Sequence, residues 1–153
     1  MKKHSPWTVA VGASGGVLAL DLDRFKRING SFGHDALLHV TRSIKQFLRK
    51  HDILARLGGD EFCIVLYGAG RTDALSFATR LTDAVSSNPF IWQDRSLDLS
   101  ISVGVCEWDA EREPQIADAL RRTDQTLIRS KARTRSSERE LGIPPFICGS
   151  TVA

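Results

Sequence analysis

Three acidic residues hold positions from which they could bind a metal ion. Asp21 follows the apolar run at residues 17–20, and Asp60 and Glu61 follow the pair Gly58–Gly59. The run is typical of a buried strand, and a Gly-Gly pair allows the positive φ angles of a tight hairpin. If the two strands are neighbours, the carboxylates converge at one edge of a sheet. Magnesium prefers oxygen ligands and often binds one or two carboxylates together with substrate phosphates.

Such a site stabilises charge during nucleotidyl transfer and favours attack by a hydroxyl group. Acidic residues at strand ends and in turns are also common as solvated surface groups. The positions of the three acids alone leave that second interpretation open.

Hydrophobic periodicity predicts the elements that must position these acids. Strands are expected at residues 17–20, 53–57, 62–67 and 97–105, and helices at 35–50, at 75–85 and from Pro114 to about 135. The order βα, ββ, αβ, α indicates an α+β fold with helices on one face of the sheet. The glycine-rich residues 12–16 favour a flexible turn, and residues 137–153 show no periodicity.

Composition narrows the class of protein. The chain has 153 residues, 42% of them hydrophobic and 25% charged, which suits one globular domain. A formal net charge of +3 suits a phosphate-rich small molecule and does not require nucleic acid. The three cysteines form no CxxC pair, which excludes a zinc ribbon and favours a reducing cytoplasm. No apolar run approaches the ~20 residues that span a bilayer, so we expect no membrane partner.

Four ordered motifs then resemble one family. Residues 57–62 read LGGDEF, and residues 21–29 read DLDRFKRIN and are followed by Gly33 and His34. Residues 101–105 read ISVGV, and residues 124–135 resemble a final helix of the pattern D-x-x-L-x-x-A-K-x-x-G-R. Together these resemble the GGDEF domain of diguanylate cyclases, which condense two GTP into cyclic di-GMP and release two pyrophosphates.

The resemblance covers residues 17–136, leaving residues 1–16 and 137–153 as flanking segments that we expect to be loose. It implies an α+β fold, a palm-like (ferredoxin-like) sheet of about five strands with helices packed around it. It also implies Mg²⁺, with Mn²⁺ as a substitute, and a homodimer, because each of two chains must present one GTP.

The resemblance assigns roles by motif position. Asp21, Asp60 and the Leu22 carbonyl would hold the metal, and Asp60 and Glu61 would be the catalytic pair. Substrate contacts would come from Phe25, Lys26, Asn29, Asp35, Lys131 and Arg135. Without the resemblance, Lys131 and Arg135 would be a basic helix end that suits the helix dipole.

The guanine contacts depend on a segment that is shorter than the family's. Asn29 keeps the position of a residue that hydrogen-bonds the guanine edge. His34 stands where the family has its guanine-binding Asp, and Asp35 follows one residue later. Residues 3–16 also lack the helix and the D-x-L-T-G-L-x-N-R segment that usually precede the first strand.

A second site is implied at Arg49 and Asp52, which fit the family's RxxD motif for inhibition by product, with Arg80 as a further arginine. Their alternative interpretation is an exposed charge pair at a helix end, which contributes little to stability. Two alternatives to the cyclase remain. One is a degenerate domain that binds GTP or cyclic di-GMP as a regulatory module, and the other is a different palm-like nucleotidyl transferase.

Overall fold

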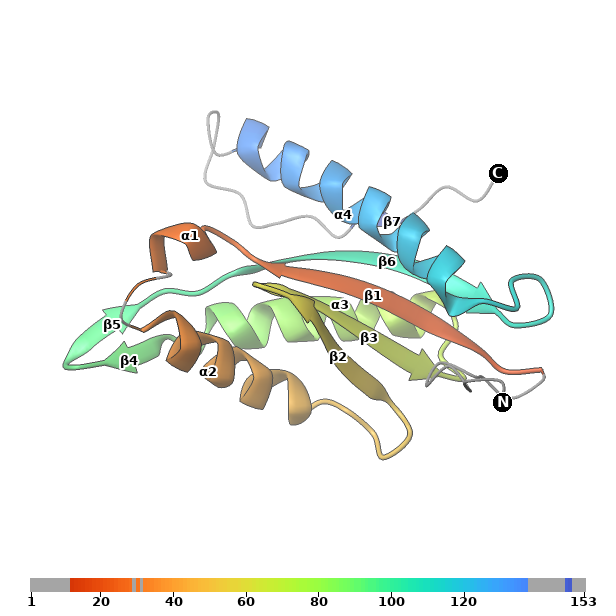
Figure 1. Ribbon diagram of the computed structural model, residues 1–153, viewed down its shortest axis with the longest axis horizontal. Helices are drawn as coiled ribbons and strands as arrows, with labels where there is room; N and C mark the ends of the chain where they lie inside the picture. The colour runs from red at the N-terminus through yellow and green to blue at the C-terminus, as the bar shows by residue number, and fades with distance from the viewer. Residues whose placement is uncertain (1–11, 29, 31, 138–147, 150–153) are drawn as a thin grey trace, which may run out of the picture.

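Four antiparallel strands form the centre of the fold, and three long helices pack on them (Figure 1). The computed structural model describes residues 12–28, 30, 32–137 and 148–149. The elements are β1 (Ser14–Leu22), α1 (Phe25–Ile28), α2 (Gly33–Lys45), β2 (Ile53–Gly58), β3 (Glu61–Tyr67), α3 (Arg71–Ser86), β4 (Phe90–Trp92), β5 (Arg95–Leu97), β6 (Ile101–Asp109), α4 (Ile116–Ser137) and β7 (Cys148–Gly149). The expected α+β sheet is confirmed.

β1 is the strand on which the arrangement depends. The sheet order is β2-β3-β1-β6-β7, in which the short β7 pairs in parallel with β6. Asp21 of β1 lies opposite Glu61 of β3 on one side and opposite Ser102 of β6 on the other. The end of β1 therefore lies between the two strands that carry residues of the motifs LGGDEF and ISVGV.

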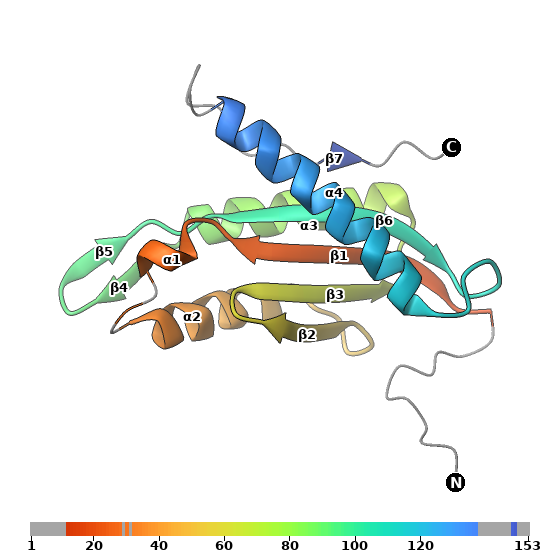
Figure 2. The same cartoon turned by 45° about the horizontal axis from the view of Figure 1, so that its top comes forward.

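Helices cover both faces of the sheet, so the expectation of helices on one face alone was wrong. Leu18, Leu20 and Leu22 point into the core that α2 and α3 cover, whereas Val17 packs in a second core beneath α4. Figure 2 shows α4 crossing the sheet on the side opposite α3. The continuous apolar run in β1 follows from this arrangement, because a strand buried on both faces does not alternate.

α4 approaches β6 closely at a glycine. A Cβ atom on Gly104 would lie 2.5 Å from the Thr123 carbonyl oxygen and 2.7 Å from the Leu127 amide nitrogen. Gly104 pairs with Ala19, another small residue, so the helix can lie almost directly on the strands. One helical turn beyond Leu127 brings Lys131 to the level of Asp21, two residues beyond Ala19 in β1.

Several element boundaries differ from those the sequence predicted. β1 begins at Ser14, and Gly15 and Gly16 belong to the strand rather than to a flexible turn. A Cβ atom on Gly15 would lie 2.2 Å from the Leu66 carbonyl oxygen, so this glycine permits close strand pairing. Helix α2 ends at Lys45, five residues earlier than predicted.

Three short strands were not predicted as separate elements. The hairpin of β4 and β5 was missed because its strands have three residues each, too few for a period-two pattern. The two-residue strand β7 lies within the stretch that shows no hydrophobic periodicity. Within the described residues, no helix has the length and apolarity that a membrane span requires.

The close contact at Gly104 yields a stability prediction. Gly104→Val should lower the free energy of unfolding by about 1–3 kcal/mol, because its side chain would meet the backbone of α4 and force the helix outward. Gly30→Ala is the matched control, since a Cβ there has nothing within 4 Å. Urea unfolding measures both variants. Equal stabilities for Gly104→Val and wild type would show that α4 does not lie as closely as described.

Candidate active site

The carboxylates of Asp21 and Asp60 meet at one edge of the sheet, as the sequence predicted. The turn between β2 and β3 contains Gly59, whose φ of +51° favours glycine. Arg56 Nε donates to the Gly59 carbonyl at 2.8 Å, and the Leu22 amide donates to the Asp60 carbonyl at 3.3 Å. The first bond closes the hairpin turn and the second ties that turn to the end of β1, which brings Asp60 beside Asp21.

The carboxyl group of Asp21 is buried and has charged neighbours of both signs. Burial, and then the neighbouring Asp60 carboxyl, raise the pKa of Asp21 to about 6, although Lys131 acts in the opposite direction. The Lys131 ammonium pairs with Oδ2 of Asp21. The other oxygen, Oδ1, is buried and has no hydrogen-bond partner. A buried acceptor left without a partner costs free energy, so this oxygen is suited to a cation.

The residues at this edge fit a magnesium ion. Asp21 Oδ1 is free to coordinate, Asp60 adds a second carboxylate, and the Leu22 amide donates to the Asp60 carbonyl. Glu61 lies opposite Asp21 in the strand pairing and is exposed. In the part of the chain that the structure describes, no three His, Cys, Asp or Glu side chains come together as a complete metal cage. A site of this kind leaves coordination positions for water and substrate phosphates.

Asp23 is a residue of this edge that sequence reasoning missed. Its carboxylate accepts hydrogen bonds from Ser100 Oγ at 2.8 Å and Ser102 Oγ at 2.6 Å, and its amide donates to the Ser100 carbonyl at 2.9 Å. These contacts fasten the end of β1 to β6, just before Arg24 takes a left-handed φ of 56°. The two serines in the predicted strand were the available signal, because a buried serine needs a polar partner.

The residues predicted to contact phosphate differ in their positions and in how exposed they are. Lys131 is at the carboxylate edge, on Asp21. Phe25 is only 8% exposed and packs in the core, so its backbone is what remains for a ligand. Lys26 is exposed on α1. Arg135 belongs to α4, with its side chain outside the described residues.

Among the described residues, the structure does not bring the side chains predicted to bind guanine together. Asn29 lies outside them. Asp35 lines a hollow of about 500 Å³ between α2 and β4, with Trp92. His34 lines a different hollow of about 280 Å³ beside the LGGDEF hairpin, with Arg56 and Phe62. The role of Asp35 in guanine binding stays a prediction.

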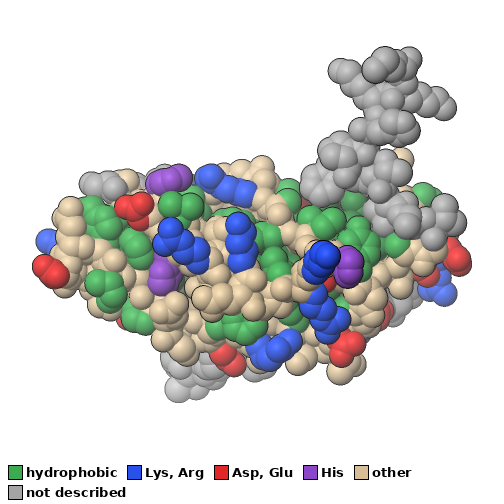
Figure 3. Space-filling view, turned by 90° about the horizontal axis from the view of Figure 1, so that it is seen from below, with side chains coloured by type: hydrophobic (Ala, Val, Ile, Leu, Met, Phe, Trp, Pro, Cys, Tyr) green, Lys and Arg blue, Asp and Glu red, His purple; other side chains and the backbone are tan. Residues whose placement is uncertain are grey.

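The residues of the predicted product site lie on loops and helices away from the carboxylates. Arg49 and Asp52 lie in the connection between α2 and β2, where the Asp52 carboxylate accepts the Arg49 amide at 2.7 Å. That bond fixes the turn and leaves the Arg49 guanidinium exposed. Arg80 is exposed on α3. Figure 3 shows basic side chains spread over the underside of the molecule as it stands in Figure 1.

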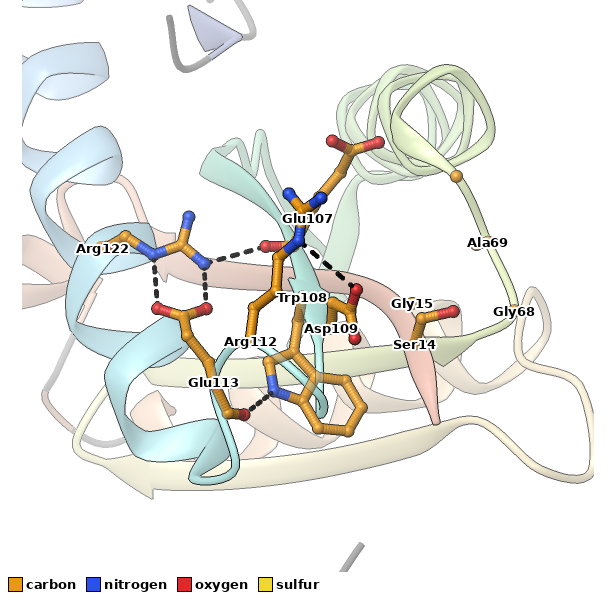
Figure 4. A pocket seen from close by; sticks show the side chains of 11 residues that line it. Ser14, Gly15, Gly68, Ala69, Glu107, Trp108, Asp109, Arg112, Glu113 and Arg122 are labelled. Carbon is orange, nitrogen blue, oxygen red and sulfur yellow. Dashed lines mark hydrogen bonds and ion pairs between the residues drawn. The ribbon is translucent and has the colours of Figure 1, made fainter. Parts of the chain in front are cut away.

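A hollow of about 550 Å³ lies at the other end of the sheet (Figure 4). Arg122 binds the Glu113 carboxylate and the Glu107 carbonyl, Arg112 pairs with Asp109, and Trp108 Nε1 donates to the Glu113 carbonyl at 3.0 Å. Ser14 lines this hollow, seven residues from Asp21 along β1 and therefore about 23 Å away. It is no part of the carboxylate site.

Comparison with known families agrees with this geometry. Residues 6–137 match the family described as "Diguanylate cyclase, GGDEF domain". The chain belongs to the GGDEF family. A GGDEF relative, the probable diguanylate cyclase DgcE of Escherichia coli (strain K12), is 40% identical over 116 residues, which are 73% of this chain and 10% of DgcE.

The names of other relatives state either the same function or a different one. The cyclic di-GMP phosphodiesterase NbdA of Pseudomonas aeruginosa is 36% identical over 125 residues, covering 79% of this chain and 16% of NbdA. The crystal structure of the diguanylate cyclase SiaD with its activator SiaC, from Pseudomonas aeruginosa, superposes with a TM-score of 0.71 at 29% identity. That match covers 78% of this chain and 47% of SiaD. The chain thus spans a small part of the curated relatives it matches.

The raised pKa of Asp21 predicts how the metal-free protein responds to pH. Between the ordinary pKa of 3.8 and the folded value of about 6, the folded state binds more protons than the unfolded state. The free energy of unfolding should therefore fall as pH rises through this window, because ionising Asp21 opposes its burial. Urea unfolding in EDTA from about pH 4 to pH 7 measures the slope.

Asp21→Asn should remove most of that slope, whereas Asp83→Asn, a change at an exposed carboxylate on α3, should keep it. A slope in Asp21→Asn equal to that of wild type would mean that another group titrates.

Proposed function

We propose that this GGDEF domain is a diguanylate cyclase, which joins two GTP molecules into cyclic di-GMP. The observation that carries the proposal is the buried Asp21 oxygen without a partner, placed beside Asp60 within the LGGDEF hairpin. In each half-reaction a GTP 3′-oxygen attacks the α-phosphorus of the other GTP, and the bond to pyrophosphate breaks. A second step of the same kind, in which the two nucleotides exchange roles, closes the ring and releases the second pyrophosphate.

The chain's own residues would bind and orient the substrate. A bound Mg²⁺ would supply charge stabilisation for the phosphates and the attacking oxygen. Asp21, Asp60 and the Leu22 carbonyl would hold that ion, and Glu61, exposed at the same edge, would support the attacking group. Lys131, whose ammonium already lies at this edge, would bind a phosphate, with Arg135 one turn further along α4.

The reaction requires two copies of the domain. Each site would hold one GTP, so the 3′-hydroxyl and the α-phosphate that react are presented by different chains. We propose a homodimer with its two carboxylate edges facing each other. Since a displacement of about 1 Å can cost a hundredfold in rate, this pairing controls turnover.

A regulatory module that binds GTP or cyclic di-GMP is the second candidate. Two observations favour it: Asp35 and His34 line different hollows, and a phosphodiesterase, NbdA, is among the relatives that this domain matches. A module of this kind would bind nucleotide through the surviving contacts and would form no phosphodiester bond.

Incubation with GTP and Mg²⁺, with products resolved by mass, separates the two candidates. We expect cyclic di-GMP from wild type, at a specific activity that rises with protein concentration because the dimer is the active form. Asp60→Ala and Glu61→Ala should each lower turnover by at least about a hundredfold, since each removes a charged group at the reacting centre. Asp83→Ala is the control for loss of a carboxylate elsewhere.

Wild-type turnover retained in Asp60→Ala would refute the assignment of that residue. Nucleotide binding without any product, even at high protein concentration, would establish the regulatory module instead.

The second proposed site is a surface for cyclic di-GMP at Arg49 and Asp52, with Arg80 contributing. Arg49→Ala should weaken cyclic di-GMP binding by about 1.5–3 kcal/mol, because it removes a charge-assisted hydrogen bond. Lys50→Ala removes an equal charge from the neighbouring exposed residue and should change the affinity little. Titration calorimetry measures both variants, and equal losses in them would reduce the site to general attraction by surface charge.

A further inference from the structure

The Lys131 ammonium pairs with a carboxylate that a metal ion would also bind. This ammonium pairs with Asp21 Oδ2, and the two side chains are only 28% and 11% exposed. The other oxygen of the same carboxylate is buried and has no partner. An ammonium and a metal ion would thus compete for one carboxylate, beneath a helix whose position is fixed by its contact at Gly104.

We propose that Lys131 is a built-in counter-ion of the metal site, which occupies Asp21 until a metal–nucleotide complex displaces it and offers it a phosphate. The proposal rests on the proposed function, because it concerns the same carboxylates. Lysine suits this role, since its ammonium is a compact point charge on a flexible four-carbon stem. α4 fixes the backbone of Lys131, so only the stem has to move.

The charges at the site explain why displacement is needed. Asp21 and Asp60 are adjacent carboxylates, and without a cation their negative charges repel each other at a partly desolvated position. Lys131 offsets part of that charge in the metal-free protein. A divalent ion bound to both carboxylates would offset all of it, and the ammonium would then lie beside a like charge. The ion and Lys131 therefore exclude one another from Asp21.

This exclusion couples metal binding to nucleotide binding. A free metal ion at Asp21 Oδ1 would lie beside the Lys131 ammonium on Oδ2 of the same carboxylate, and displacing that ammonium would leave it without an anionic partner. A metal ion that arrives with a triphosphate supplies Lys131 with a new anionic partner. Because such coupling is reciprocal, the nucleotide should raise metal affinity by the same factor by which the metal raises nucleotide affinity. The site would thus remain nearly free of metal until nucleotide is present.

The test measures binding of Mn²⁺ alone to the nucleotide-free protein, from the electron paramagnetic resonance signal of the unbound ion. Lys131→Met and Lys131→Gln should bind Mn²⁺ about 10- to 100-fold more tightly than wild type, the range expected for losing one charge-assisted competing contact. Lys131→Arg keeps a cation on Asp21 and should bind Mn²⁺ as weakly as wild type. Arg129→Met removes an equal charge from an exposed position on the same helix and is the matched control.

Thermal melting gives a second readout. Lys131→Met should melt below wild type in EDTA, because it leaves a buried carboxylate without its cation. Added Mn²⁺ should raise its melting temperature more than that of wild type.

For nucleotide affinity, the same substitution should have the opposite effect from the one it has on Mn²⁺ affinity. A GTP analogue with a methylene group between its α- and β-phosphorus atoms cannot release pyrophosphate, so its binding can be measured with Mn²⁺ present. Lys131→Met should bind this analogue more weakly than wild type and should show a smaller coupling between metal and nucleotide.

Mn²⁺ affinity in Lys131→Met equal to that of Arg129→Met, or below that of wild type, would overturn the proposal. The Mn²⁺ measurement needs no catalysis, so it stands whether or not the domain makes cyclic di-GMP. Conversely, wild-type cyclase activity without tighter Mn²⁺ binding in Lys131→Met would refute this inference and leave the proposed function intact.

Discussion

The close packing of α4 on β6 is the constraint from which the rest of the site follows. Gly104 has no side chain, so the backbone of α4 lies within contact distance of the strand. The helix therefore covers the end of β1 and excludes water from Asp21. It also sets Lys131, one turn past that contact, on the carboxylate. The burial of Asp21 and its pairing with Lys131 therefore both result from this contact between helix and strand.

That burial works against stability and in favour of ligand binding. Burial and the Asp60 carboxyl both raise the pKa of Asp21, which means that the folded chain holds this ionised group at a cost. A buried ion pair repays desolvation only when its hydrogen bonds are complete, and Asp21 Oδ1 has none. Groups left in this condition are common at functional sites, because a ligand can supply the missing interactions. The sheet and its two cores supply the stability that the site lacks.

The sequence predicted the carboxylate edge well because short-range rules govern it. A Gly-Gly turn between two apolar strands allows few geometries, and LGGDEF places Asp60 in that turn and Glu61 directly after it, at the start of β3. The approach of Asp60 to Asp21 needed one further assumption, that β1 and β3 are neighbours, and the sheet order confirms it. The position of α4 was not predictable in the same way, because a helix pattern shows which face is apolar and not which side of a sheet receives it. Asp23 was missed for a similar reason, since its serine partners lie 77 and 79 residues away.

The connection between α1 and α2 shows how a local change can alter one part of a site and spare another. Successive residues on a helix are rotated by about 100°, so a carboxylate moved by one position faces a different neighbour. His34 accordingly lines the hollow beside the LGGDEF hairpin, whereas Asp35 lines the hollow beside β4. The carboxylates and Lys131 are held by β1, the β2–β3 hairpin and α4, none of which contains that connection. The length of that connection therefore determines which side chains line the two hollows, whereas Asp21, Asp60 and Lys131 do not depend on it.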